Sequence, residues 1–266
     1  MNIYFITIAN KITVELEILQ KSAKINNINL IVLGLHKNIE IGHHYGFGWK
    51  LILLRNFLRE LNYNDIFIFM DAFDVVILSN VHEILKKFFI FKCKILFSAE
   101  NYCWPDSNKE TLYKIKTKFH NYLNSGTFMA YVGYFKKFYD IHSFLIDIKT
   151  DDQRYYTDLY LQYQDKINFI TLDRKSKIFM CLAGAEDLLV FDKFKNRFKN
   201  KQTNQYPCII HSNGKNKSFI NYFDKNFMET IIIEPFAYKK KFYNFYLIII
   251  ILLMVIILIY INPIFH

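Results

Sequence analysis

Residues 66–78 read IFIFMDAFDVVIL, an apolar run that is interrupted only by Asp71 and Asp74. Apart from these two aspartates, all residues of the run suit the middle of a buried β-sheet. An isolated carboxylate in a dry protein interior costs several kcal/mol unless a partner compensates its charge. The stretch therefore predicts a buried strand whose carboxyl end presents two acidic groups to a cation.

Alternating strands and helices extend from this run in both directions. Residues 2–9 (NIYFITIA) and 28–34 (INLIVLG) predict strands before it, and residues 93–100 (CKILFSAE) predict one after it. Segments with helical periodicity separate these strands, and a glycine-rich turn at residues 45–50 (YGFGWK) leads into one of them. This alternation is typical of βαβ units around a mostly parallel sheet.

The second half of the chain has shorter and less regular elements. Residues 122–133 (YLNSGTFMAYVG) predict a turn that leads into a strand, and residues 151–163 (DDQRYYTDLYLQY) predict a helix with an acidic start. Late strands are expected within INFITL, KIFMCL and PCIIH. No repeat or linker divides these segments, so we expect one α/β domain over residues 1–235.

The composition supports a folded domain and argues against several classes of protein. Of the 266 residues, 52% are apolar and 22% are charged, which allows a sizeable core. The formal charge of +10 comes from scattered lysines, so we expect no nucleic-acid partner, and the basic run at residues 192–201 predicts a solvated helix or loop. The four cysteines are far apart, match no zinc or disulfide pattern, and are compatible with a reducing compartment.

The carboxyl-terminal part of the chain has a different character. Residues 245–261 (FYLIIIILLMVIILIYI) contain no charge and would reach about 26 Å as a helix, close to the hydrocarbon thickness of a bilayer. We predict one transmembrane helix there, and a buried core helix or strand is the alternative. A basic juxtamembrane segment at residues 236–244 precedes it, and no basic residue follows it. These charges predict a single-pass membrane protein whose main domain is cytoplasmic.

The two aspartates lie where a ligand would bind. In open α/β sheets, ligands collect at the carboxyl ends of strands, and Asp71 follows the apolar strand directly. Asp74 can turn back toward the same point, and two carboxylates at this spacing suit Mn²⁺ or Mg²⁺. The alternative is that one aspartate caps a turn and the other pairs with a lysine.

Five segments, in order along the chain, resemble one known family. They are FMDAFDVVIL, AENYCWPD, YLNSGTFMAYVG, DDQRYYTDLYL and IIHSNGKNK. Together they resemble the glycosyltransferase domain of procollagen lysyl hydroxylases, and collagen galactosyltransferases share part of the pattern. The resemblance covers roughly residues 1–222. It implies a GT-A-type nucleotide-sugar fold that uses a UDP-sugar and Mn²⁺.

The resemblance also implies a set of metal ligands. Asp71 and Asp74 match the metal-binding aspartates of the family, and His211, in HSNG, matches the third ligand. Taken alone, such a histidine is more often a core or loop residue. Its place after an apolar strand suits the ligand role.

Four further residues are expected to lie near the nucleotide sugar. Lys50, in GFGWK, matches a lysine that approaches the phosphates, where glycines would permit close backbone approach. Gly214 and Lys217 match a loop near the diphosphate, and Trp104 offers a flat face to the sugar or the acceptor. The alternatives are an ordinary solvated lysine on a helix and an aromatic residue that anchors a loop.

Three residues are expected to act in sugar binding and catalysis, two of them in the family's acidic stretch. Asp151 and Asp152 stand in that stretch, although Thr150 replaces the first of the three acids that relatives often carry. Asp151 and Asp152 are equally suited to cap a helix. Asn124, in LNSG, is expected to orient either the donor sugar or the acidic loop, and turn formation is the alternative.

The expected reaction is the transfer of glucose or galactose from a UDP-sugar to a protein hydroxyl. By resemblance, the acceptor is hydroxylysine or galactosyl-hydroxylysine in a collagen-like chain. No 2-His-1-carboxylate motif is evident, so we expect transferase activity alone. Two alternatives stay open: a membrane-associated glycosyltransferase for a lipid or another glycan, and an inactive binding module with the same fold.

Overall fold

The computed structural model describes most of one folding unit, Met1–Ile220. The described residues are 1–35, 37, 39–40, 42, 46–142, 146–215 and 219–220. Over these residues, no helix is both long and apolar enough to cross a membrane. The predicted juxtamembrane segment (236–244) and transmembrane helix (245–261) lie outside the described residues.

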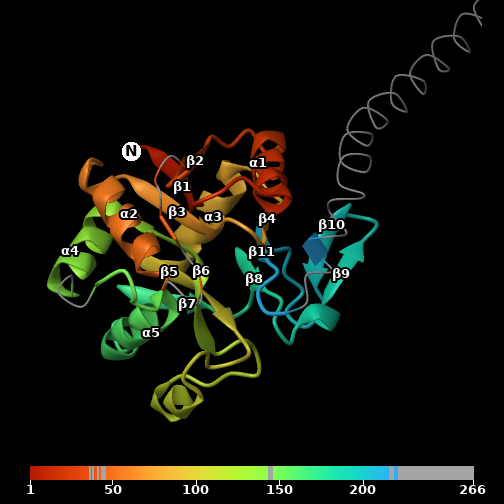
Figure 1. Cartoon of the computed structure of the whole chain (residues 1–266). Coiled ribbons are helices and arrows are strands. Elements are labelled where there is room, and N and C mark those ends of the chain that lie inside the picture. The colour runs from red at the N-terminus through yellow and green to blue at the C-terminus, as the bar shows by residue number, and fades with distance from the viewer. Residues whose placement is uncertain are drawn as a thin grey trace, which may run out of the picture. The chain divides into compact units, whose positions relative to one another are not determined.

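Strands and helices alternate along the chain, as the sequence predicts (Figure 1). The strands of the central sheet are β1 (Ile3–Ile8), β2 (Leu30–Leu33), β3 (Ile66–Asp71), β5 (Ile95–Glu100), β6 (Tyr122–Tyr131) and β7 (Ile170–Asp173). The α-helices are α1 (Val14–Ile25), α2 (Gly48–Arg59), α3 (Val81–Phe91), α4 (Val132–His142) and α5 (Asp152–Tyr163). The other elements are short: β4 (Val75–Ile77), β8 (Phe179–Cys181), β9 (Leu189–Asp192), β10 (Arg197–Asn200), β11 (Ile209–His211) and the 3₁₀ helices η1 (Ser107–Leu112) and η3 (Glu186–Leu188).

The central sheet has the strand order β2-β1-β3-β6-β5-β7. β1 pairs in parallel with β2 and β3, and β5 pairs in parallel with β7, whereas β6 runs antiparallel to both of its neighbours. Parallel neighbours need a crossover, which α1 and α2 provide between the first three strands. The sheet is therefore mostly parallel, which confirms the predicted α/β class.

Helices cover both faces of the central sheet. α2, α4 and α5 pack on one face, around an aromatic core in which Phe128 stacks on Phe135 with ring centroids 5.3 Å apart. α1 and α3 pack on the other face, together with the short strands β4, β8 and β11. Thr13 and Asn80 cap these two helices by accepting amide hydrogen bonds at 3.3 and 3.1 Å. Because β3 is covered on both faces, its sequence is continuously apolar up to Asp71.

A three-stranded sheet has the order β4-β11-β8, with β11 antiparallel to β4 and parallel to β8. The hairpin β9–β10 packs against this sheet, with Leu189 and Phe198 in contact with the apolar side chains of β8 and β11. The expectation of a helix or loop over residues 192–201 is wrong for residues 197–200, which form β10. The strand is favoured because Phe198 pairs across the hairpin with Phe191, at a ring-centroid distance of 5.2 Å.

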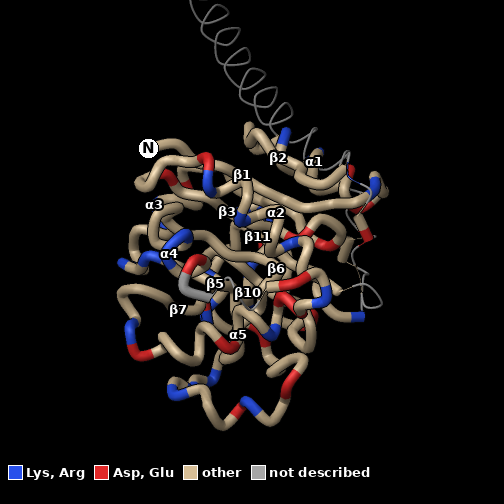
Figure 2. The backbone as a smooth tube through the Cα atoms, turned by 60° about the vertical axis from the view of Figure 1, so that its left-hand side comes forward, with Lys and Arg blue, Asp and Glu red and all other residues tan. Residues whose placement is uncertain are grey.

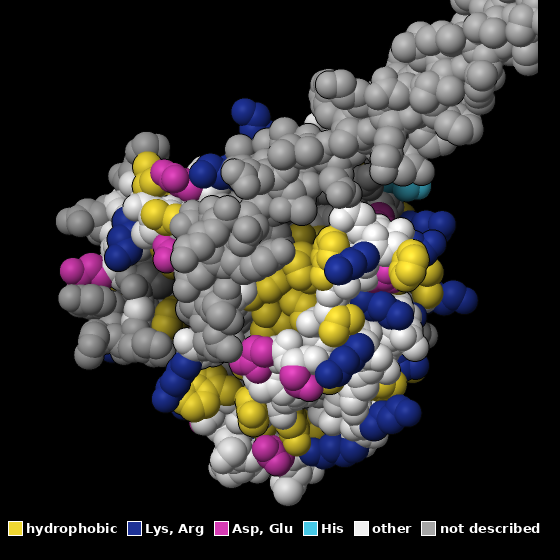
Figure 3. All heavy atoms as spheres, turned by 90° about the vertical axis from the view of Figure 1, so that its right-hand side faces the viewer, with side chains coloured by type: hydrophobic (Ala, Val, Ile, Leu, Met, Phe, Trp, Pro, Cys, Tyr) yellow, Lys and Arg dark blue, Asp and Glu magenta, His cyan; other side chains and the backbone are white. Residues whose placement is uncertain are grey.

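Charged residues of both signs are spread along the backbone of the domain (Figure 2). The face on which the β9–β10 hairpin lies shows hydrophobic side chains interspersed with Lys and Arg (Figure 3).

Candidate active site

Strand pairing brings the predicted metal ligands together. Asp71 is the last residue of β3, and Asp74 immediately precedes β4 after a bend. β4 pairs with β11 so that His211 lies opposite Val75, and the Ser212 amide donates to the Asp74 carbonyl at 2.7 Å. The β4–β11 ladder therefore fixes the distant histidine beside the two aspartates.

The three side chains converge on one point. His211 Nε2 lies 3.1 Å from Asp74 Oδ1 and 3.8 Å from Asp71 Oδ2, and one ligand atom from each residue lies within 4.8 Å of the others. An ion that binds its ligands at about 2.1 Å can contact all three after small side-chain movements. The aspartate side chains are 26% and 16% exposed, whereas that of His211 is only 4% exposed. The aspartate side is thus open to further oxygen ligands, as Mn²⁺ and Mg²⁺ require.

Electrostatics favour a cation at this point. Burial raises the pKa of Asp71, and the nearby Lys50 ammonium only partly opposes that effect. Burial alone would lower the pKa of His211, but the Asp74 carboxylate raises it well above its ordinary value. The imidazole therefore faces the aspartates as a proton donor, and a divalent cation bound to the same three atoms would displace that proton.

A bulge in β6 makes room for the histidine ring. The register between β5 and β6 shifts so that Ser98 faces Asn124, which leaves extra residues on β6. Gly126 lies among them, and a Cβ atom at its position would fall 2.1 Å from His211 Cε1 and 2.8 Å from Asp71 Oδ2. Because only glycine lets β6 approach both side chains this closely, the Asn-Ser-Gly segment is shaped by the site.

Asn124 and Glu100 fix the orientation of the histidine ring. Asn124 Oδ1 lies 3.0 Å from His211 Nδ1 and accepts the Gly126 amide at 2.9 Å. Asn124 Nδ2 donates to Glu100 Oε1 at 3.0 Å, and Asn213 Nδ2 donates to the other carboxylate oxygen at 2.8 Å. An amide oxygen beside Nδ1 requires a hydrogen on that nitrogen, so Nε2 is left to face the aspartates. Burial raises the pKa of Glu100 to about 7.

Lys50 connects the cluster of predicted metal ligands (the metal-ligand cluster below) to α5. Its Nζ lies 2.6 Å from Asp71 Oδ1 and 2.7 Å from Asp152 Oδ2, and only 11% of its side chain is exposed. Burial would lower the pKa of Lys50, but Asp152 and Asp71 raise it above the ordinary value. Lys50 is therefore a permanent ammonium ion between a predicted metal ligand and a predicted catalytic acid.

A close contact between two loops places Lys50 and Asp152 together. A Cβ atom on Gly46 would fall 2.4 Å from the Ile148 carbonyl oxygen, and one on Gly48 would fall 1.7 Å from the Asp147 carbonyl oxygen. Gly46 also has a φ of +87°, which favours glycine. These glycines therefore let the chain at the start of α2 pack closely against the segment that leads into α5. As a result, α2 and α5 begin side by side.

The two acids at the start of α5 have different surroundings. Asp151 is the N-cap residue, and its Oδ1 accepts the Arg154 amide at 2.8 Å. Asp152 is only 5% exposed, and its Oδ2 accepts from Ser125 Oγ at 3.1 Å in addition to its contact with Lys50. Asp151 therefore stabilises the helix start, whereas Asp152 belongs to the polar site.

Hydrogen bonds and ion pairs thus join six of the predicted residues in one polar site: Lys50, Asp71, Asp74, Asn124, Asp152 and His211. A family model described as the PLOD GT domain matches residues 1–234. The chain belongs to the PLOD GT domain family. It is therefore a glycosyltransferase domain by descent, and the resemblance inferred from the five segments is confirmed.

Curated relatives of this PLOD GT domain are larger proteins. Procollagen-lysine,2-oxoglutarate 5-dioxygenase 1 of Gallus gallus is 34% identical over 229 residues, which cover 83% of this chain and 31% of the relative. The multifunctional procollagen lysine hydroxylase and glycosyltransferase of Caenorhabditis elegans is 35% identical over 236 residues, which cover 82% of this chain and 31% of the relative. The chain thus spans about a third of the length of these relatives.

Among solved structures, the galactosyltransferase LgtC in complex with donor and acceptor sugar analogues is similar to this chain. The alignment has a TM-score of 0.47 and 12% identity, and it covers 87% of this chain and 95% of LgtC.

Three other residues of the PLOD GT domain were predicted to contact the nucleotide sugar, and these contacts stay predictions. Trp104 is 62% exposed on the loop after β5. Gly214 follows β11 with a φ of +86°, and a Cβ atom there would meet Ala183 Cβ at 3.2 Å. Lys217 lies outside the described residues.

Several residues whose roles were not predicted from the sequence join the site of the PLOD GT domain. Glu100 ends the apolar strand β5, and the rule that places Asp71 at a strand end could have found it. Ser125 and Gly126 lie inside the Asn-Ser-Gly segment, and Gln153 Oε1 accepts the Ser125 amide at 2.7 Å. Gln153 therefore links the bulge of β6 to the start of α5.

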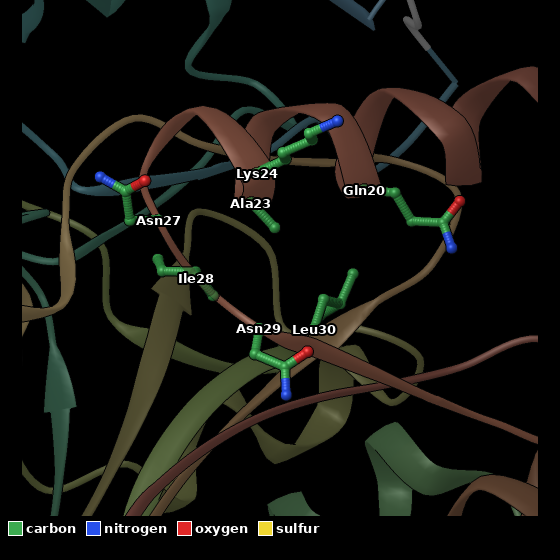
Figure 4. A pocket seen from close by; sticks show the side chains of 7 residues that line it. All are labelled: Gln20, Ala23, Lys24, Asn27, Ile28, Asn29 and Leu30. Atoms are coloured by element: carbon green, nitrogen blue, oxygen red, sulfur yellow. The ribbon is translucent and has the colours of Figure 1, made fainter.

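A separate surface pocket of about 520 Å³ lies between the end of α1 and β2 (Figure 4). Its lining residues are Gln20, Ala23, Lys24, Asn27, Ile28, Asn29 and Leu30. The pocket shares no residue with the polar site and contains one charged side chain. It therefore offers neither a set of metal ligands nor a pair of catalytic acids.

Proposed function

We propose that this PLOD GT domain transfers a hexose from UDP-glucose or UDP-galactose to an acceptor hydroxyl, with Mn²⁺ or Mg²⁺ as the metal. The observation that carries the proposal is the convergence of Asp71, Asp74 and His211 on one point in a member of a glycosyltransferase family. Two carboxylates and an imidazole suit these ions, and the open aspartate side leaves room for diphosphate oxygens. When bound, the ion supplies positive charge against the diphosphate that leaves the sugar.

The residues around the cluster have distinct proposed roles. Lys50 stays protonated and supplies a second positive charge near the diphosphate. Asp152 faces the same space from α5, where its carboxylate can accept hydrogen bonds from sugar hydroxyls or take the proton of the acceptor. Asn124 holds His211 in the tautomer that directs Nε2 toward the aspartates.

The proposed acceptor is a hydroxylysine, or galactosyl-hydroxylysine, in a collagen-like chain. Support comes from the relatives, whose names refer to procollagen lysine and, for the Caenorhabditis elegans protein, to a glycosyltransferase. Trp104 stays a candidate for acceptor or donor contact, because it is exposed on a loop, whereas Asp151 is assigned to the cap of α5.

We also propose that residues 245–261 anchor the protein in a membrane as a single span, with the transferase domain in the cytoplasm. The uncharged sequence of that segment and the preceding Lys239, Lys240 and Lys241 support this proposal. Truncation after Lys241 should turn a carbonate-resistant membrane protein into one that is released. Continued membrane retention of the truncated chain would contradict a single anchor.

The central experiment measures UDP release by the purified full chain with UDP-glucose and UDP-galactose, with and without Mn²⁺. Hydroxylysine peptides and lipid acceptors are then compared as substrates. We expect metal-dependent release that Asp71→Asn abolishes, because the variant loses a charged ligand. Near-normal turnover by Asp71→Asn would refute the metal site, and no release with either donor would favour an inactive binding module.

A further inference from the structure

The β9–β10 hairpin carries exposed apolar side chains. Val190 and Phe191 are 38% and 44% exposed, and Phe194 at the tip is 102% exposed, although it is an aromatic residue. Scattered apolar side chains are ordinary on protein surfaces. Val190 and Phe191 are neighbours in β9 and point to opposite faces of the hairpin, so the fully exposed ring of Phe194 at the tip is the feature that calls for a partner. On the face that Figure 3 shows, hydrophobic side chains lie next to Lys and Arg.

Hydrogen bonds hold the tip of the hairpin in one conformation. Asp192 Oδ1 accepts the amides of Phe194 and Lys195 at 3.0 and 3.2 Å, and Asp192 Oδ2 accepts from Tyr206 Oη at 2.5 Å. Asn196 completes the turn with a φ of +51°. The turn is therefore ordered, and it directs Phe194 away from the body of the domain.

The same element is strongly basic. Residues 189–201 contain five basic side chains and one acidic side chain, that of Asp192. The Asp192 carboxylate already accepts hydrogen bonds within the turn. Lys193 and Lys195 flank Phe194, are exposed, and form no ion pair within the described part of the chain. An apolar tip flanked by exposed lysines is complementary to a surface whose outer layer is negatively charged and whose interior is apolar.

We propose that the β9–β10 hairpin docks on an anionic lipid bilayer, with Phe194 in the acyl region and Lys193 and Lys195 against lipid phosphates. A specific protein interface buries at least about 1,000 Å² in total, which so narrow a tip does not supply, whereas a bilayer accepts a single inserted ring. The uncharged residues 245–261 of the same chain support a bilayer as the partner. This inference concerns a surface outside the polar site and does not depend on the proposed transferase activity.

The test places an environment-sensitive fluorophore at the tip of the full chain. Phe194→Cys is labelled with a nitrobenzoxadiazole probe, because all four native cysteines are buried. Ser107→Cys, on the exposed start of η1, carries the same probe as the matched control. Both proteins are reconstituted in nanodiscs of phosphatidylcholine, with or without phosphatidylglycerol, and quenching by spin-labelled acyl chains is measured.

We expect quenching at position 194 and none at position 107, and stronger quenching when phosphatidylglycerol is present. Lys193→Gln and Lys195→Gln should each lower the ratio of docked to undocked tip about fivefold in the anionic discs. Equal quenching at both positions, no quenching at position 194, or no response to anionic lipid would each overturn the proposal. Protection of position 194 by an acidic peptide, without lipid quenching, would assign the hairpin to a protein partner instead.

Discussion

Gly126→Ala should disable the metal-ligand cluster without removing any ligand. The added Cβ would fall 2.1 Å from His211 Cε1, 2.7 Å from His211 Nδ1 and 2.8 Å from Asp71 Oδ2. Non-bonded carbons normally stay about 3.5 Å or more apart, so the ring must move by about 1.4 Å. β6 cannot retreat, because it is hydrogen-bonded between β3 and β5.

A displacement of that size exceeds the tolerance of about 0.2 Å for metal–ligand distances. We therefore expect the Mn²⁺ affinity to fall by about 100-fold or more, while overpacking lowers the free energy of unfolding by about 1–3 kcal/mol. Electron paramagnetic resonance of free Mn²⁺ gives the affinity, and urea denaturation gives the stability.

Gly133→Ala is the matched control for this prediction. A Cβ atom there would fall 2.0 Å from the ring of Tyr63, so the control creates similar crowding outside the metal-ligand cluster. It should lose stability but keep its Mn²⁺ affinity. A Gly126→Ala protein that folds and binds Mn²⁺ as tightly as the parent would refute the reasoning, and so would an equal loss of affinity in the control.

Three further predictions concern charges in the site. Lys50→Met should lower the free energy of unfolding, measured in urea, by about 3 kcal/mol, because Asp71 and Asp152 would lose their shared cation; an unchanged value would contradict that. Asp151→Ala should cost about 1 kcal/mol of stability through the lost cap and leave transfer largely intact, whereas Asp152→Asn should keep donor binding and lose transfer. Burial raises the pKa of Glu100 from 4.5 to about 7, so between these pH values the native state binds one more proton than the unfolded state. The free energy of unfolding should therefore fall by about 3 kcal/mol as the pH rises through this range. Urea titrations at several pH values should show this fall in the parent and not in Glu100→Gln; parallel profiles would argue against it.

The sequence predicted the central sheet because its signals are local. The apolar run of β3 and the helical periodicity on either side of it indicate βαβ units without any knowledge of the rest of the chain. Asp71 could likewise be placed at the carboxyl end of β3, since the apolar run stops there. Local rules were sufficient wherever neighbours in sequence are also neighbours in the sheet.

The site depends on contacts between distant segments, which local patterns do not encode. Nothing in the residues around His211 indicates that β11 pairs with β4, and only the family resemblance assigned the histidine to the aspartates. The roles of Gly126 and Glu100 likewise depend on the bulge of β6 and on side chains from other strands. The hairpin of residues 189–200 was not predicted, because its lysines make the stretch read as a basic, solvated segment. The pairing of Phe191 with Phe198 across the hairpin is not visible in the sequence.

The order of the strands also has a consequence for biosynthesis. His211 is delivered by β11, which is the last strand of the described chain to leave the ribosome. A nascent chain that already contains β3 and β4 has both aspartates but not the imidazole, so it can hold a divalent ion only weakly. Under the proposed metal role, tight capture of the ion becomes a late event of maturation, and a chain released early would emerge without it.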